Sequence, residues 1–369
     1  TGCFARAAAE RHSISRLWKQ SSGLMARSVT QNAGDHGEHY ITRDKKEYWA
    51  MFYSAAGGGV LIALMALFKT YLGSIIDDKV WKGIAEGLNY GLGFMVIFML
   101  HFTVATKQPA MTAARFAEAV EKTPQGKCVN MKLAQLLVDV FRSQSIAVLG
   151  NVLIAMGLAA LIAFGYQYKT GEPLMNADQI AYQLHSIDPF AGSLWFAAIA
   201  GVWLFCSGII SGYFDNRSNY LNMRMRLTQH PLLKKLMSEK SRVKFANYMH
   251  ENYGSLIGNF CFGMLLGLTG LVGYLTHLPL DIRHVAFSSA NLGYSAVSGQ
   301  FAYPFFLQCI AFVLLIGLVN LMVSFSLTLW VALRSLNTEI DSWWAIWHEV
   351  CQIVKKRPLS LFFPVQLDK

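Results

Sequence analysis

The sequence has little charge for its length and few residues that interrupt helices. Charged residues make up 15% of the 369-residue chain, whereas soluble proteins carry about 25%. A chain with so few charges lacks the polar surface that a water-soluble fold of this size needs. Only nine prolines are present and aromatic residues reach 13%, which excludes an intrinsically disordered or a collagen-like chain. The composition therefore indicates a protein of the lipid bilayer.

Cysteine is also scarce, and its placement excludes two common kinds of site. The chain has six cysteines and no Cys-x-x-Cys pair, so it offers no zinc-finger or dithiol redox motif. Three cysteines lie in long apolar stretches and three lie in segments that we predict to be cytoplasmic, so we expect no structural disulfide. No phosphate-binding loop, nucleophile elbow or zinc-peptidase motif is present either. We expect no cofactor.

Hydrophobic residues, by contrast, are abundant and gather in six long stretches. They make up 54% of the chain, and the mean hydropathy is +0.34. A membrane helix needs roughly 20 mostly apolar residues, because each adds about 1.5 Å and the hydrocarbon layer is about 30 Å thick. The stretches that meet this length are Met51–Leu72, Ile84–Thr106, Ser145–Tyr166, Gly192–Phe214, Tyr253–Thr276 and Phe305–Leu333.

These stretches predict an all-α, polytopic integral membrane protein. We expect a cytoplasmic amphipathic N-terminal segment (1–50), a six-span transmembrane domain (51–333) and a cytoplasmic interfacial tail (334–369). The connections between the spans are too short for an independent catalytic domain, and we expect them to be helical on the cytoplasmic side. Because the chain begins with Thr1, we expect it to be the C-terminal part of a longer protein.

Lysine and arginine lie mainly in alternate connections. Most of the 32 cations precede the first span or lie in the second connection, the fourth connection and the tail. The exceptions are Lys69, Lys79, Lys82, Lys169 and Arg283. Cytoplasmic loops are enriched in Lys and Arg, so we predict a multi-pass membrane protein with both termini cytoplasmic. The same distribution explains the net charge of +10 through topology and anionic lipid, without nucleic acid as a partner.

One semi-polar segment, Asp281 to Gly299, is too short and too polar for a comfortable span. Counting it as a seventh span would place the cations of the tail outside, against the charge rule. We therefore predict a periplasmic re-entrant or interfacial helix whose polar side chains line a periplasmic mouth. The alternative is that Asp281 caps a short helix and Arg283 pairs with it or with lipid phosphate. The candidate mouth residues are Asp281, Arg283, His284, Ser288, Ser289 and Asn291.

Polar side chains within the spans form a second candidate site. The functional interpretation is a cytoplasm-facing pocket for a substrate or a proton, in which His101 titrates near neutrality. The alternative is hydrogen bonding between helices, worth about 0.6 kcal/mol per contact. The candidate pocket residues are His101, Asn151, Ser207, Ser211, Asn259 and Asn320.

A third candidate precedes the first span. Asp35, His36, Glu38 and His39 form a compact polar cluster, and imidazole with carboxylate suits Zn, Mn or Fe. The glycines on either side of His36 oppose the helix that would bring both histidines onto one face. The alternative is a turn whose polar groups cap the following helix.

Glycines recur four residues apart, which places each pair on one face of a helix and lets two backbones approach closely. This spacing indicates a tightly packed bundle. The pairs are Gly87/Gly91, Gly208/Gly212, Gly254/Gly258 and Gly263/Gly267.

Five sequence motifs together resemble one bacterial family. The motifs are Gly34–Asp44, Ala105–Ala110, Gly212–Arg217, Gly258–Gly263 and Asp281–Asn291. They are similar to those of the bacterial transmembrane proteins known as site-specific recombinases, typified in gonococcus, and the similarity runs through nearly all of the chain. The resemblance implies a location in the bacterial inner membrane, and full-length members that carry a larger N-terminal region. It brings no catalytic residue with it.

The residues themselves do not supply recombinase chemistry. A tyrosine recombinase has a His-x-x-Arg motif, and none of the ten histidines is followed by Arg three residues later. A serine recombinase needs a soluble domain that grips duplex DNA, and no such domain fits between these spans. We therefore interpret the chain as a non-catalytic membrane protein for transport or for lipid or solute handling. Two alternatives stay open: a membrane scaffold for cytoplasmic partners, and the DNA recombination that the family name implies.

Overall fold

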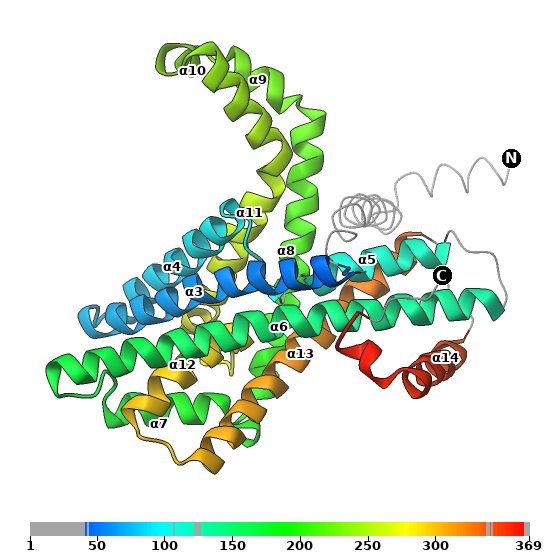
Figure 1. Ribbon diagram of the computed structural model, residues 1–369. Coiled ribbons are helices and arrows are strands. Elements are labelled where there is room, and N and C mark those ends of the chain that lie inside the picture. The colour runs from blue at the N-terminus through cyan, green and yellow to red at the C-terminus, as the bar shows by residue number, and fades with distance from the viewer. Residues whose placement is uncertain are drawn as a thin grey trace, which may run out of the picture.

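The computed structural model describes residues 41–42, 44–105, 108–121, 127–336, 340 and 342–364. Every regular element among them is a helix, which confirms the all-α prediction (Figure 1). In chain order the elements are α3 (Lys45–Ile75), α4 (Lys79–Met99), α5 (Gln108–Glu121), α6 (Lys127–Thr170), α7 (Ala177–Ile187), η3 (Pro189–Ala191), α8 (Ser193–Tyr220), α9 (Met223–Gln229), α10 (Pro231–Leu236), α11 (Glu239–Thr276), α12 (Val285–Ser298), α13 (Tyr303–Ser335), α14 (Trp343–Lys356) and η4 (Pro358–Leu361).

Five helices are long and apolar enough to cross a membrane, as expected of a multi-pass membrane protein. They are Lys45–Ile75, Asn130–Thr170, Ser193–Tyr220, Glu239–Thr276 and Tyr303–Ser335. Each corresponds to one predicted span. All five run beyond the apolar stretch at one end or both, so that α6 reaches 44 residues and α11 reaches 38. The extra turns are more polar than the apolar stretches, and they form part of the connections between the long helices.

The second predicted span, Ile84–Thr106, differs from the helix that forms. Helix α4 starts five residues earlier, where the Asp78 side chain accepts the N–H groups of Val80 and Trp81, and it ends at Met99. The earlier start brings Lys79 and Lys82 into α4, and the earlier end leaves it with 21 residues, fewer than any of the five helices above.

Helix α4 nevertheless packs closely within the bundle. It lies against α11 and α3, and its glycine pair faces a glycine pair of α11. A Cβ atom added to Gly263 would collide with the backbone of Gly91, and one added to Gly267 would collide with the backbone of Gly87. Two of the spacings noted in the sequence therefore form one helix–helix contact.

Helix α12 occupies the middle of the bundle. Its 14 residues are about 21 Å long, and most of them are buried between α6, α13, α3 and α7. Phe287 and Tyr294 of α12 join the largest hydrophobic cluster, which also takes side chains from α3, α4, α6, α8 and α11. The hydroxyl of Tyr294 donates to the Ala63 carbonyl of α3 at 2.9 Å. The segment predicted to be re-entrant is thus a short helix enclosed by other helices of the bundle.

A second hydrophobic cluster lies at one end of the bundle, in a group of helices that we call the platform: α5, α14, the first part of α6 and the last part of α13. Phe116, Leu329 and Ile346 are buried within it. Beside it, the buried Arg142 of α6 pairs with Asp139 at 3.0 Å and donates to the carbonyl groups of Thr42 and Ser360. This one guanidinium joins both ends of the described chain to α6.

The end of α8 and the start of α11 project from the bundle as a hairpin that carries α9 and α10 at its tip (Figure 1). We call residues 215–252 the arm. In the view of Figure 1 the arm bends away from the axis of α8, toward the side of the bundle where α3 and α4 lie.

Candidate functional site

Asn151 is buried in α6 and binds the extended segment that follows α4. Its Oδ1 atom accepts the N–H of Ala105 at 2.7 Å. Its Nδ2 atom donates to the carbonyl of Thr103 at 2.9 Å and also to the carbonyl of Ala55. Thr103 in turn donates its N–H to the Ser54 carbonyl at 3.1 Å. The chain after α4 therefore runs along α3, held in place from α6.

Asn320 plays the same structural part in α13. It is fully buried, and its Oδ1 atom accepts the N–H of Val285 at 3.1 Å. Its Nδ2 atom donates to the carbonyl groups of Ala197 at 2.7 Å and Arg283 at 2.9 Å. Asn320 thus fixes the extended segment that leads into α12 and ties it to α8.

The other candidate pocket residues lie elsewhere. Ser207 and Asn259 donate to carbonyl groups of their own helices, Leu204 in α8 and Ser255 in α11. Ser211 faces Gly258 of α11, so close that a Cβ atom there would lie 2.9 Å from the Ser211 Cβ. The exposed His101 stands at the bend after α4 with a φ of 58°. The structure therefore brings the two serines to the α8–α11 contact, whereas Asn151 and Asn320 bind two different extended segments.

The candidate mouth residues divide into two groups. Asp281 and Arg283 lie in the extended segment and form an ion pair at 2.6 Å. Arg283 also donates from Nε to the Ser186 carbonyl at 2.7 Å and from its backbone N–H to the Phe196 carbonyl at 3.2 Å. These bonds fasten the segment to α7 and to the start of α8.

The remaining four mouth residues lie at the N-cap of the enclosed helix or within it. His284 is buried at the start of α12, with its ring within 6.0 Å, centroid to centroid, of Phe94, Phe262 and Phe287. Ser288 and Ser289 are buried too, and Asn291 is half-buried.

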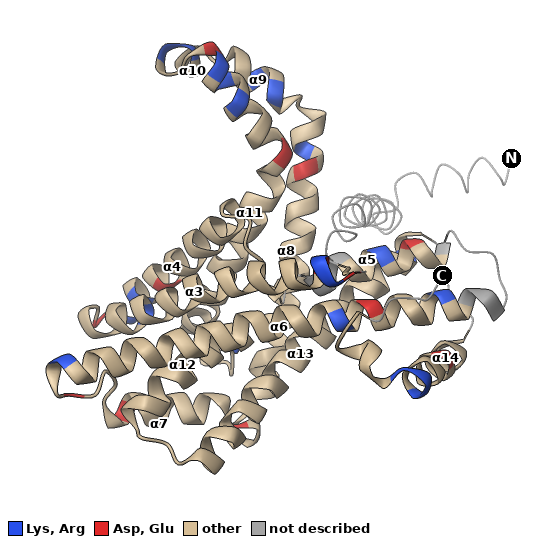
Figure 2. Cartoon of the chain, in the orientation of Figure 1, with Lys and Arg blue, Asp and Glu red and all other residues tan. Residues whose placement is uncertain are grey.

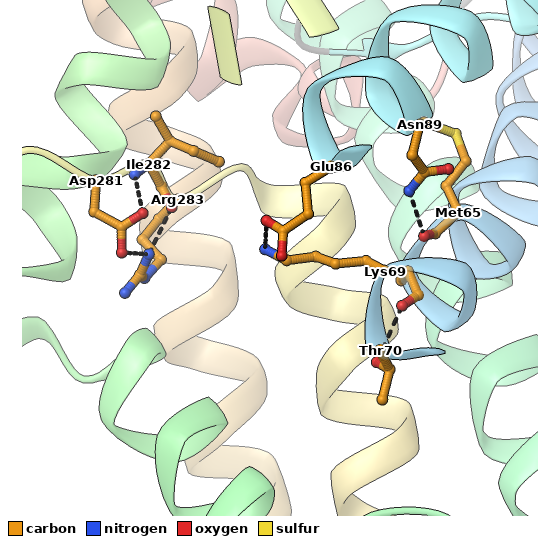
Figure 3. A network of polar contacts seen from close by, with 9 residues as sticks. Met65, Lys69, Thr70, Glu86, Asn89, Asp281, Ile282 and Arg283 are labelled. Atoms are coloured by element: carbon orange, nitrogen blue, oxygen red, sulfur yellow. Dashed lines mark hydrogen bonds and ion pairs between the residues drawn. The ribbon is translucent and has the colours of Figure 1, made fainter. Parts of the chain in front are cut away.

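A charged pair that was not among the predicted site residues lies near the Asp281–Arg283 pair (Figure 3). Lys69 of α3 and Glu86 of α4 are 3.3 Å apart, with side chains 34% and 14% exposed. The Lys69 ammonium also lies 5.6 Å from the centre of the Tyr90 ring. Ionisable side chains inside membrane helices are costly and commonly mark functional sites. We call Lys69, Glu86, Asp281 and Arg283 the charged cluster.

The sequence contains the information that predicts this pair, but the information is divided between two spans. Lys69 lies near the end of one predicted span and Glu86 near the start of the next, and the intervening turn is short. Two helices joined in this way run antiparallel, so a cation near the end of the first can meet an anion near the start of the second. Single-span hydropathy does not report such a pairing.

The metal candidates Asp35, His36, Glu38 and His39 lie outside the described residues. Within the part of the chain that the structure describes, no three His, Cys, Asp or Glu side chains are grouped so that they could hold a metal ion.

Comparison with known proteins gives one match. A family described as site-specific recombinase matches residues 2–364. No curated protein and no solved structure shows a significant match. The matched residues include all five motifs that carry the sequence resemblance. The chain therefore belongs to the site-specific recombinase family.

Proposed function

We propose that this protein is a rigid membrane-embedded scaffold that presents the platform to partners on the inner side of the membrane. The observation that carries the proposal is the use of Asn151 and Asn320. An asparagine side chain offers two donor hydrogens and one acceptor oxygen, and each of these amides already makes three hydrogen bonds to the backbone. A solute would have to compete with the contacts that hold the fold.

Two further polar groups inside the bundle also bond across elements. The indole N–H of Trp203 in α8 donates to the Thr269 hydroxyl of α11 at 2.8 Å, and Tyr294 joins α12 to α3. Each bond links two elements of the bundle. Buried polar groups whose partners are all supplied by the fold make an interior rigid, which suits a scaffold better than a transporter that must change shape.

The proposal includes a sixth crossing by α4. Three residues separate α3 from α4, so the two helices run in opposite directions. The 21 residues of α4 are about 31 Å long, which is close to the thickness of the hydrocarbon layer. A crossing by α4 places the platform and the arm on the inner side with both termini, and the charged cluster toward the outer side. In this arrangement α12 enters from the outer side.

Solute handling at the charged cluster is the second candidate function. The observation that favours it is the partial exposure of Lys69, 34% for its side chain, beside the more buried Glu86. A carboxylate and an ammonium at this depth could bind a polar solute from the outer side. The Arg283 guanidinium donates to backbone carbonyl groups, so we do not include it among the groups that would bind the solute.

Flux measurements on the reconstituted full chain distinguish these two functions. Sealed vesicles with a pH-sensitive dye inside are challenged with gradients of protons, potassium ions and a panel of amino acids. The scaffold proposal predicts the same flux with the protein as in protein-free vesicles. A protein-dependent flux that Glu86→Gln abolishes would contradict it and establish solute handling. DNA cleavage or strand joining by the same preparation would instead establish recombination.

A further inference from the structure

The arm concentrates positive charge. Between Asp215 and Glu251 the chain carries eight Lys or Arg residues and three Asp or Glu residues. Figure 2 shows cations around α9 and α10, whereas the long middle stretches of the bundle helices are mostly tan. The cations at the tip, all exposed, are Arg224, Arg226, Lys234 and Lys235.

Large apolar side chains are exposed among these cations. Tyr220 is 87% exposed, Leu236 is 78% exposed and Met225 is 68% exposed. Leu232 of α10 is exposed as well. Single exposed apolar residues are common on any surface, but here four of them fall within seventeen residues that also carry four cations.

The arm is a folded element. The Asp215 carboxylate accepts the N–H of Gly254 at 2.8 Å, and a Cβ atom at Gly254 would collide with Asp215 and with the Ser211 carbonyl. The Ser218 hydroxyl lies 3.1 Å from Nδ1 of His250. Helix α9 packs on α11 beyond this point. The tip therefore presents its cations and apolar groups from a defined position.

We propose that the tip of the arm, α9 and α10, docks on the anionic inner surface of the same membrane that the spans cross. This inference rests on the membrane placement of the chain and on the inner position of the arm, but not on the scaffold function. Basic helices with exposed Leu, Met and Tyr bind the interface of anionic bilayers, because headgroups attract the cations while the apolar side chains enter the acyl boundary. A nucleic acid would engage the cations but would leave the aliphatic side chains in water.

The bilayer is also the nearest anionic surface. Helix α8 ends at Tyr220, six residues or about 9 Å beyond the predicted span end at Phe214. The start of α9 follows within three residues. The bend of the arm away from the axis of α8 (Figure 1) keeps the tip from extending straight into the cytoplasm.

Amide hydrogen exchange on the full chain in nanodiscs tests this docking. Nanodiscs of phosphatidylcholine alone are compared with nanodiscs that also contain phosphatidylglycerol. We expect exchange in peptides covering residues 223–236 to be about tenfold slower with the anionic lipid, and this difference to shrink at high salt, because each cation near the surface contributes about 1 kcal/mol that salt screens. Equal exchange in the two lipids overturns the proposal.

Variants identify the groups responsible. Replacing Arg224, Arg226, Lys234 and Lys235 by Gln should remove the lipid-dependent slowing. The matched control removes the same charge from exposed sites outside the arm, namely Lys45, Lys46, Lys355 and Lys356, and should leave the slowing at 223–236 in place. Unchanged exchange in the membrane part of α11 shows that the variants are folded. The proposal is overturned if the control set removes the slowing, or if the tip set leaves it.

Two further measurements test the role of the apolar side chains and the possibility of a nucleic-acid partner. Changing Leu232 and Leu236 to Ser should weaken the lipid-dependent slowing at least threefold. Duplex DNA added to phosphatidylcholine nanodiscs should have less effect on residues 223–236 than phosphatidylglycerol has. Slowing by DNA that exceeds slowing by anionic lipid overturns docking on the membrane and assigns the tip to nucleic acid.

Discussion

The side-chain amide of Asn320 accepts the backbone N–H of Val285, the first residue of α12, at 3.1 Å, and donates to the carbonyl of Arg283, two residues earlier, at 2.9 Å. The middle of α13 thereby fixes the point where the chain turns into the enclosed helix. Asn151 holds the segment after α4 by the same pattern of bonds. In both places a buried asparagine replaces the backbone partners that an extended segment lacks inside a helix bundle.

Replacing Asn320 by Ala should destabilise the protein by about 2–4 kcal/mol, because a buried N–H and two carbonyl groups lose a partner. The measurement is the apparent Tm in detergent, followed by tryptophan fluorescence. Asn219→Ala, at an exposed position near the end of α8, is the matched control and should leave the Tm unchanged. A Tm for Asn320→Ala equal to that of the control would show that the amide does not hold the segment.

Gly263→Ala should disturb the contact between α11 and α4 and cost about 1–3 kcal/mol, because the added Cβ would meet the backbone of Tyr90 and Gly91. Gly157→Ala in α6 is the matched control, since a Cβ atom there has nothing within 4 Å. The control should be neutral or gain about 0.5–1 kcal/mol from helix propensity. Chemical denaturation of both variants makes the comparison, and similar effects at the two positions would contradict the close packing.

Lys69 and Glu86 should show a coupling energy on the order of 1 kcal/mol in a double-mutant cycle with Lys69→Met and Glu86→Gln. The value is modest because the Lys69 side chain is 34% exposed, which screens the pair. Thermal unfolding of the wild type, both single variants and the double variant supplies the cycle. Additive effects of the two single variants would mean that the ion pair is not formed in the membrane.

Arg142→Ala should release the segment around η4, because the guanidinium binds the Ser360 carbonyl and pairs with Asp139. The expected cost is about 1–3 kcal/mol. Limited proteolysis should cut between residues 357 and 364 faster in this variant than in the wild type. The exposed Lys356 offers a control, because Lys356→Ala should not accelerate the cut. Equal acceleration by both variants would show that Arg142 does not hold the segment around η4.

Much of the fold could be predicted from the sequence, because apolar length and the placement of cations are local properties. The five long helices follow from them. The end of α4 does not, since Leu100, Phe102 and Val104 continue the apolar stretch and nothing near them signals a break. The break depends on Asn151, 46 residues away from Ala105 along the chain.

For the candidate sites, too, the sequence identifies individual polar residues but not the residues that they contact. Composition and position identified Asn151, Asn320, Asp281 and Arg283 as noteworthy polar residues. Their partners are backbone groups of other elements or neighbours across a turn, and a single sequence does not report which segments meet. The Lys69–Glu86 pair follows from two antiparallel helices joined by a short turn, which the hydropathy of single spans does not report.

The most direct test concerns the path of α4 through the membrane, on which the positions of the arm, the platform and the charged cluster depend. Cysteine is introduced at the exposed Asp77, between α3 and α4, or at the exposed His101, after α4. Intact cells are then treated with a membrane-impermeant maleimide, with the unaltered chain as the baseline. We predict labelling of Asp77→Cys, and labelling of His101→Cys only after the cells are opened. Labelling of both residues in intact cells, or of neither, would contradict a crossing by α4.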